Sequence, residues 1–186
     1  NPSLVGSEMC IRDRFVRQQV KKELEKRDWD EAHAAIEAWV DKLDASTENY
    51  DLNLVEAMWA CQNVERVSEK ILSKVINAES GHARSAGARI LRYWHSELSD
   101  PAMFIAETAG DEFPRARMEA VLSAGFVPSA EAYAAALHVL DYPGDPVLDQ
   151  ALPHTKAALE RYWRPAMEAG TLAFAKESHK EFAEAS

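Results

Sequence analysis

Apolar residues recur at helical spacing along most of the chain, and no segment sustains the period-two alternation of a half-buried β-strand. The segment 28–43 carries a broad apolar stripe, and 50–62 and 65–77 continue the same pattern. Further helical segments are expected at 15–26 and 82–95, from 101 to a stop at Gly110, from 114 to a stop at Gly125, at 129–140, and from 146 to at least Tyr162. The pattern therefore predicts an all-α fold with about nine or ten helices.

Several helix boundaries are indicated by individual residues. The pairs Asp100-Pro101 and Asp145-Pro146 each combine an acidic N-cap with proline at the first helical position. Gly87 falls inside a helical pattern, where glycine costs about 1 kcal/mol relative to alanine. We expect a close approach of the neighbouring helix to explain it. Pro153 falls inside the last long helix, where we expect a kink or a break.

The stretch 111–121, D-E-F-P-R-A-R-M-E-A-V, has related copies at 82–91 and 145–152. Pairing Arg84 with Arg117 gives a step of about 33 residues, and pairing Pro114 with Pro146 gives about 32. One more short helix fits between successive copies. A period of this length built from helix pairs is typical of an α-solenoid, which is the fold we expect.

The domain organisation follows from the pattern and from the two ends. Residues 1–14 show neither helical nor strand periodicity, and they resemble sequencing-adapter DNA read through as protein. We expect a non-native tail there, and a genuine disordered tail is the alternative. Residues 15–48 are expected to form an N-terminal helical cap, 49–170 the repeats, and 171–186 a C-terminal tail or the start of a linker.

Charge and composition limit the classes of partner. The formal net charge of −10 argues against sequence-independent binding of nucleic acid and against docking on anionic lipid. No run of 18 or more apolar residues exists, so no membrane insertion is expected. The two cysteines, Cys10 and Cys61, form neither a disulfide framework nor a zinc-binding spacing.

The sequence contains no recognisable catalytic constellation. It lacks a phosphate-binding glycine loop, a G-x-S-x-G motif and an H-E-x-x-H motif, and its six histidines are dispersed. Cys61 is expected to be a buried structural thiol, and its interpretation as a nucleophile would need a low-pKa environment. We therefore expect no catalytic, cofactor-binding or metal site within this chain.

The arginines of the repeats are the most informative charged set: Arg84, Arg89, Arg92, Arg115 and Arg117. Stacking of successive repeats would align them as a ladder, which would bind an acidic partner or a phosphate backbone. Alternatively, they would pair with turn acids such as Asp111 and with helix-end carbonyls. We favour this structural interpretation and keep Arg84, Arg115 and Arg117 as candidate partner-binding residues. Trp163, beside Arg164-Pro165, is expected to be partly exposed and to contact a neighbouring domain.

Six motifs in order carry a family resemblance. They are A-W-V-D-K-L-D (38–44), Y-D-L-N-L-V-E-A-M-W-A-C-Q (50–62), H-A-R-S-A-G-A-R-I-L-R-Y-W (82–94), D-E-F-P-R-A-R-M-E-A-V (111–121), Y-P-G-D-P-V-L-D-Q-A-L (142–152) and L-E-R-Y-W-R-P-A-M-E-A-G (159–170). Together they resemble the HEAT-repeat region of bacterial haem-binding membrane-bound dehydrogenases. In that family a β-propeller precedes the repeats, and a cytochrome c domain follows them. The resemblance covers about residues 28–175 and implies HEAT-like helix pairs.

The resemblance implies a function that this chain would serve without catalysing a reaction. The chain has no C-x-x-C-H motif, so haem c is expected only in a downstream domain. The chain is accordingly expected to be a part cut from a longer protein. It would be a non-catalytic scaffold that links dehydrogenase and cytochrome c domains, with neighbouring domains of the same polypeptide as its partners. A periplasmic or exported location follows from the family alone. The alternative is a stand-alone HEAT-repeat adaptor that binds another protein.

Overall fold

The computed structural model describes residues 19, 22–23 and 28–185, and the structural statements below concern these residues. The described residues form helices and connecting segments and include no β-strand, which confirms the all-α prediction. None of these helices combines the length and apolarity needed for a membrane span. The tail predicted at 1–14 lies outside the described residues.

The chain divides into two compact units, Asn1–Ile71 and Leu72–Ser186. In the first unit, α2 (Trp29–Val40) packs against α3 (Tyr50–Asn63). The Asp28 carboxylate caps α2 by accepting hydrogen bonds from the backbone N–H groups of Asp30 and Glu31, each at 3.0 Å. The buried stripe of α2 consists of Ala32, Ile36 and Val40, whereas Trp39, which the apolar spacing placed on the same face, is 44% exposed.

Cys61 on α3 is fully buried in the first unit. Burial, with a smaller contribution from the negative charge of Glu37, raises the pKa of the Cys61 thiol to about 12. A thiol with this pKa is almost entirely protonated near neutral pH, and the thiolate is the nucleophilic form. The structure therefore favours the interpretation of Cys61 as a structural residue.

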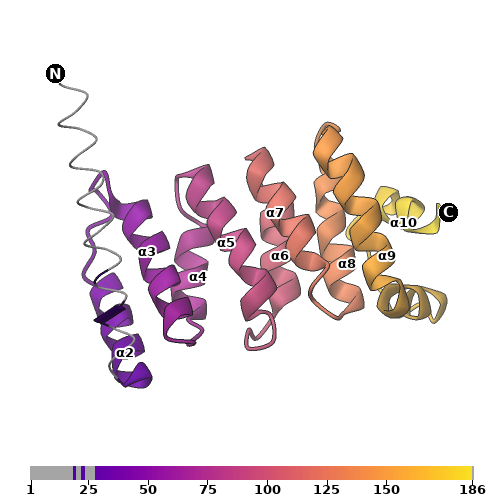
Figure 1. Cartoon of the computed structure of the whole chain (residues 1–186). Helices are drawn as coiled ribbons and strands as arrows, with labels where there is room; N and C mark the ends of the chain where they lie inside the picture. Colours follow the sequence, from indigo (N-terminus) through magenta and orange to yellow (C-terminus); the bar gives the residue numbers. More distant parts are fainter. Residues whose placement is uncertain (1–18, 20–21, 24–27, 186) are drawn as a thin grey trace. The chain divides into compact units, whose positions relative to one another are not determined.

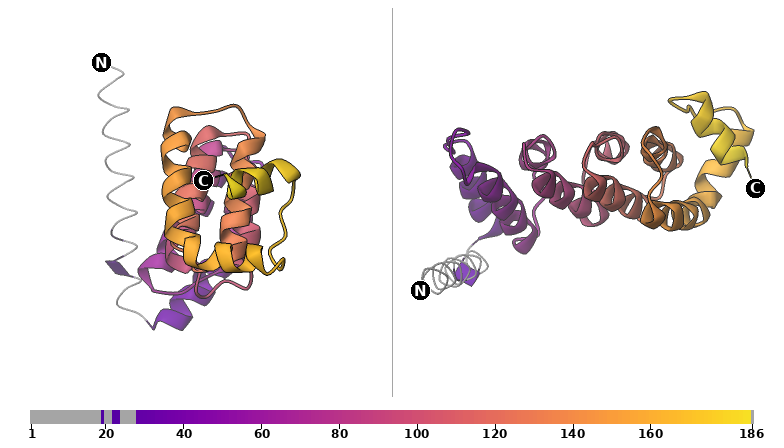
Figure 2. Two further views of the ribbon diagram at one scale, coloured as in Figure 1. Left: turned by 90° about the vertical axis from the view of Figure 1, so that its right-hand side faces the viewer. Right: turned by 90° about the horizontal axis from the view of Figure 1, so that it is seen from above.

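Helix α4 (Glu69–Ile76) crosses the boundary between the units. The second unit continues with seven elements: α5 (Gly81–Trp94), α6 (Pro101–Ala109), α7 (Pro114–Ala124), α8 (Ala130–Ala136), the 3-10 helix η1 (Leu137–Asp141), α9 (Pro146–Glu168) and α10 (Glu177–Glu184). Helix α5 packs against α7 and α7 against α9, while α6 packs against α8. Figures 1 and 2 show these helices as two adjacent rows within the second unit. Small buried residues, Ala88, Ala109 and Ala120, form part of the core between them.

The helix starts predicted from sequence are present. Asp100, Ser129 and Asp145 each accept a hydrogen bond from a backbone N–H in the first turn that follows, at 2.8 to 3.0 Å. Pro101 and Pro146 occupy the first positions of α6 and α9. These caps place the ends of α6, α8 and α9, and thereby the segments that connect the two rows.

Gly87 lies at a close helix contact, as expected. A Cβ atom at this position would lie 2.8 Å from Cγ1 of Ile76 and 3.2 Å from Cγ1 of Val75. Both distances are shorter than ordinary van der Waals contact, so a side chain at position 87 would push α5 away from the end of α4. The close approach accounts for glycine inside this helix.

Helix α9 differs from expectation at Pro153. It continues without a break over both Pro153 and Pro165, and it changes direction toward its C-terminal end, the part that contains Pro165 (Figure 1). Pro153 and Asp149, four residues before it, are both exposed. The carbonyl group that loses its helical partner at Pro153 therefore lies on the solvated side, where water can satisfy it. Helix α10 lies in the segment that we expected to be a tail or the start of a linker.

Candidate functional site

Arg84, at the start of α5, binds residues in the connection that precedes α5 and in the connection that precedes α7. Its Nε and Nη2 donate to the two carboxylate oxygens of Asp111 at 2.6 and 3.0 Å. Its Nη1 donates to the carbonyl oxygens of Ala78 and Glu79 at 3.0 and 2.8 Å. The side chains of Arg84 and Asp111 are only 13% and 7% exposed. The pair is therefore a buried bidentate ion pair, and its hydrogen bond is the main cause of the raised pKa of Arg84.

Arg117, at the start of α7, makes the equivalent backbone contacts. Its Nη1 donates to the carbonyl oxygens of Asp111 and Glu112 at 2.8 and 2.9 Å. The guanidinium carbon lies 4.2 Å from the centre of the Tyr142 ring, and the Tyr142 hydroxyl donates to the Gly110 carbonyl oxygen at 2.5 Å. Arg117 is only 5% exposed. Its contacts therefore lie within the fold, and the structure supports the structural interpretation of Arg84 and Arg117.

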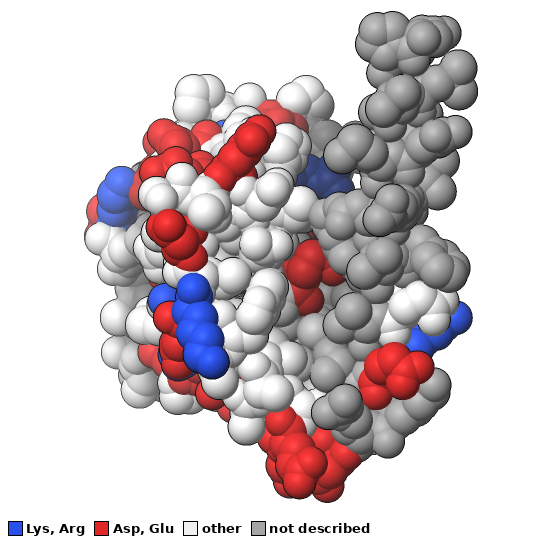
Figure 3. Space-filling view, turned by 90° about the vertical axis from the view of Figure 1, so that its left-hand side faces the viewer, with Lys and Arg blue, Asp and Glu red and all other residues white. Residues whose placement is uncertain are grey.

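Arg115 differs from these two arginines because it is exposed. Its side chain is 59% exposed, and its Nη2 lies 3.3 Å from Oε1 of Glu119, one helical turn later. The other carboxylate oxygen of Glu119 accepts from Nη2 of Arg92 on α5 at 2.6 Å. Of the three arginines proposed as partner-binding residues, Arg115 alone presents a large exposed surface. The described residues on the face shown in Figure 3 carry scattered charges of both signs and no continuous basic surface.

Trp163 is fully buried, so the prediction of partial exposure is wrong. Its ring stacks on Tyr133 of α8 with 4.9 Å between ring centres, and its Nε1 donates to the Lys156 carbonyl oxygen at 2.8 Å. The side chain reaches back along α9 to the Lys156 carbonyl and contacts Tyr133 of α8. Trp163 is therefore a core residue of the second unit.

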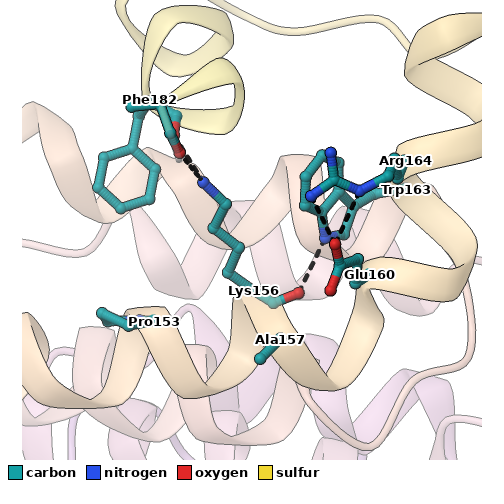
Figure 4. A pocket seen from close by; sticks show the side chains of 8 residues that line it. Pro153, Lys156, Ala157, Glu160, Trp163, Arg164 and Phe182 are labelled. Carbon is teal, nitrogen blue, oxygen red and sulfur yellow. Dashed lines mark hydrogen bonds and ion pairs between the residues drawn. The ribbon is translucent and has the colours of Figure 1, made fainter.

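A cleft of about 400 Å³ lies between α9 and α10 and is mainly apolar, with charged groups at its rim (Figure 4). It is lined by Pro153, Lys156, Ala157, Glu160, Trp163, Arg164, Phe182 and Ala185. In Figure 4 the Lys156 side chain points from α9 toward Phe182 on α10, while Arg164 and Glu160 of α9 pair with each other. The charged groups that line the cleft therefore already interact with other groups of the protein.

Lys156 joins α9 to the C-terminal end of α10. Its ammonium group donates to the carbonyl oxygen of Phe182 at 3.2 Å and to that of Ala185. It lies 5.6 Å from the centre of the Trp163 ring and 5.5 Å from that of the Phe182 ring. Burial and the neighbouring Arg164 lower the pKa of Lys156, and Glu160 opposes them. A cation at the last carbonyls of a helix is electrostatically favourable.

Asp141, at the end of η1, contacts the opposite end of α10. Its carboxylate lies 2.7 Å from Nζ of Lys176 and 3.0 Å from Nε2 of His179, and His138 of η1 lies 3.6 Å away. The His179 side chain is fully buried, and its ring meets that of His138 edge-on at 5.4 Å. Burial acts to raise the pKa of Asp141, but the hydrogen bonds from Lys176 and His179 outweigh it and hold the pKa below its ordinary value.

The contacts of α10 were missed at the sequence level, although a weak signal was present. His179, Phe182 and Ala183 are spaced three and four residues apart, which places them on one face of a helix. The acceptors, Asp141 and Lys156, lie in other elements and have no local signature. No group of three or more His, Cys, Asp or Glu side chains among the described residues is arranged to hold a metal ion.

Comparisons with known protein families, with curated proteins and with solved structures found no match for this chain.

Proposed function

We propose that this chain is a non-catalytic α-solenoid scaffold of HEAT-like helix pairs. The observation that carries the proposal is a bonding pattern that recurs with the sequence repeat. Arg84 and Arg117 each donate from Nη1 to the two carbonyl oxygens that lie six and five residues earlier in the chain. Each arginine therefore joins the start of its helix to the connection that precedes it.

The contacts between successive helices recur in the same way. The Ser123 hydroxyl on α7 donates to the Ala88 carbonyl oxygen on α5 at 2.8 Å, and the Thr155 hydroxyl on α9 donates to the Val121 carbonyl oxygen on α7 at 2.9 Å. The acceptors are about 33 residues apart and the donors about 32, in agreement with the steps found in the sequence. Equivalent joints of this kind support a stack in which each repeat contacts its neighbours.

The fuller form of the proposal rests on the family resemblance. In it, the repeats hold a dehydrogenase domain and a cytochrome c domain of a larger haem-binding redox protein in a fixed relation, in the periplasm or another exported location. Electrons would pass between centres bound in those other domains. A stack of small, locally packed interfaces suits this role, because many modest contacts together set its geometry.

Recovery of the complete reading frame from the source DNA tests the domain context first. The proposal predicts propeller-like strands upstream and a C-x-x-C-H motif downstream in one continuous frame. A frame that begins near Phe15 and stops after Ser186 would contradict it and would leave the adaptor alternative.

The scaffold role itself is tested by lengthening the array in the complete protein. A second copy of residues 85–117 inserted after Arg117 keeps the sequence period and adds one step to the stack. We expect substrate oxidation with an artificial electron acceptor to be retained, and reduction of the haem to slow. Loss of substrate oxidation in a folded protein would place catalytic groups in this region and contradict a non-catalytic scaffold.

A further inference from the structure

Helix α10 is held on the second unit by polar contacts at both of its ends. Before its first turn, Lys176 pairs with Asp141, and His179 reaches the same carboxylate from within the first turn. At the other end, Lys156 binds the carbonyl oxygens of Phe182 and Ala185. An acidic group near a helix N-terminus and a cation at its C-terminus both complement the helix dipole. The two anchors therefore define the direction and the length of the helix that fits between them.

The contacts that η1 and α9 provide stabilise α10 more than interactions within α10 do. Within α10 the buried residues are His179 and Ala183, and most of the other side chains are exposed. A helix of eight residues is too short to be stable alone in water. The helical state of α10 therefore depends on the surface provided by η1 and α9.

Helix α10 fills this surface incompletely. The cleft of about 400 Å³ lies on one side of Phe182, and a second cavity of about 290 Å³ is lined by Phe182 together with Tyr142, Leu148 and Leu152. Nδ1 of the fully buried His179 has no hydrogen-bond partner. Unfilled apolar volume and an unsatisfied buried polar atom both weaken docking. A helix with a larger side chain at the position of Phe182 would use space that α10 leaves empty.

The segment between α9 and α10 allows α10 to detach without disturbing α9. Residues 169–176 are non-helical, and Gly170 adopts a φ of 68° with open space around the position of a Cβ atom. The segment begins with bonds from the Thr171 and Leu172 N–H groups to the Ala166 carbonyl oxygen, which close the end of α9 itself. Release of α10 therefore requires the loss of the contacts at Asp141, His179, Ala183 and Lys156.

We propose that the surface between Asp141 and Lys156 is a docking site for a short amphipathic helix of a partner protein, and that α10 is its resident intramolecular occupant. The partner helix carries a cation just before its first turn, a hydrogen-bond donor to Asp141 in that turn, and a small residue one turn later. A large apolar side chain between them enters the two cavities, and the last carbonyls face Lys156. This inference goes beyond the scaffold function and does not depend on which domains flank the repeats.

A peptide of residues 174–185, labelled at its N-terminus, is the probe that tests this site. It is titrated by fluorescence anisotropy against the full chain and against the full chain carrying Ala183→Glu, whose own α10 cannot bury position 183. We expect at least tenfold tighter binding to the Ala183→Glu chain, because the attached helix of the original chain competes at an effective concentration of about 1 mM. The same peptide carrying Ala183→Glu is the matched control and is expected not to bind.

Two variants show whether the named groups form the site. Lys156→Met in the Ala183→Glu chain removes the cation and is expected to weaken peptide binding at least tenfold. A peptide with Phe182→Trp is expected to bind more tightly than the original, because the larger ring enters the cavities. If Ala183→Glu unfolds the chain, Lys176→Glu replaces it, since Lys176 is exposed and its reversal repels Asp141.

The inference is overturned if the peptide fails to bind a folded chain whose α10 is released, or if Lys156→Met leaves its affinity unchanged. Weaker binding of the Phe182→Trp peptide would show that α10 already fills the site, and would overturn the assignment to an external helix. A dimer of the original chain that Ala183→Glu dissociates would assign the surface to α10 of a second copy instead. None of these outcomes depends on the haem or dehydrogenase domains of the proposed function.

Discussion

The contact between α5 and the connection that precedes α7, and the attachment of α10, both use charged groups, and they differ in how far those groups are buried. Arg84 and Asp111 are 13% and 7% exposed, whereas Lys176 and Asp141 are 54% and 22% exposed. Removing one member of a buried pair leaves an uncompensated charge, while an exposed pair contributes little because water competes for both groups. Similar chemistry therefore gives a strong contact between Arg84 and Asp111 and a weak one between Lys176 and Asp141 at α10.

The two regions also differ in how often their contacts occur. The arginine–carbonyl contacts and the hydroxyl–carbonyl contacts each occur twice along the second unit, between different pairs of elements. The contacts of Asp141 and Lys156 with α10 occur at one end of the unit. We therefore expect that changes at the contacts of α5, α7 and α9 alter global unfolding, and that changes at α10 act locally.

The largest effect is expected at Arg84. Arg84→Met leaves the Asp111 carboxylate buried without its partner and is expected to lower the free energy of unfolding by about 3 kcal/mol in urea titrations. Arg115→Met is the matched control: the Arg115 side chain is 59% exposed and Glu119 keeps its bond from Arg92, so the expected loss is about 0.5 kcal/mol or less. Equal losses for the two variants would contradict the role assigned to burial.

A smaller loss is expected from Gly87→Ala. The new methyl group would meet Ile76 and Val75, and this overpacking exceeds the gain in helix propensity by about 1 kcal/mol. Thermal unfolding measures the difference. Gly144→Ala is the control, since the nearest atom there lies 3.9 Å from the added Cβ. A stabilised Gly87→Ala protein would show that α5 does not pack closely on the end of α4.

A similar or smaller loss is expected from Thr155→Val. The change removes the buried hydroxyl that donates to the Val121 carbonyl oxygen and is expected to lower the free energy of unfolding by about 1 kcal/mol. Thr171→Val removes a comparable hydroxyl–carbonyl bond to Ala166 at an exposed position, so its effect should be close to zero. If both substitutions are neutral in urea titrations, the joint between α7 and α9 does not depend on this bond.

The smallest effect on global stability is expected from loss of the Asp141 charge, which acts at α10. The pKa of Asp141 is held below its ordinary value of 3.8, so its contribution to docking is present above that pH and is lost as the pH falls through the lower, folded value. His138, His179 and Lys176 are the charged or titratable groups that face this carboxylate. NMR amide signals of α10 should therefore lose protection below pH 3.8 before those of α5.

Asp141→Asn is the control for the acid experiment. The amide keeps the shape of the carboxylate but cannot ionise, so α10 should be less protected at neutral pH and should show no further loss on acidification through this range. If α10 in the variant retains the acid transition of the original chain, another group is responsible for it.

The helices of the second unit could be predicted from sequence because their signals are local. Asp100, Ser129 and Asp145 cap helices within their own first turns, and the period was visible in the steps between arginines and between prolines. The structural interpretation of the arginines was available too, because Asp111 stands in the same motif as Arg117. What the sequence left open was which arginine pairs with the acid, and the structure assigns Arg84 to it.

Trp163 and α10 could not be predicted because their environments depend on tertiary contacts. The pattern around Trp163 shows an aromatic residue near a proline, but its burial depends on contact with Tyr133 on another helix. The segment 171–186 is polar and alanine-rich, and its helix relies on Asp141 and Lys156, which lie in distant elements. A short helix stabilised mainly by its docking surface leaves little trace in its own sequence.

Native-state hydrogen exchange, followed residue by residue across the second unit, tests the contrast between the two regions most directly. The account predicts that buried amides of α5 and α7 exchange through global unfolding, with a shared free energy that urea titration reproduces, and that amides of α10 exchange through a local opening of lower free energy. Arg84→Met should lower the first value, and Lys156→Met should lower only the second. A single free energy shared by α5, α7 and α10 would contradict the account.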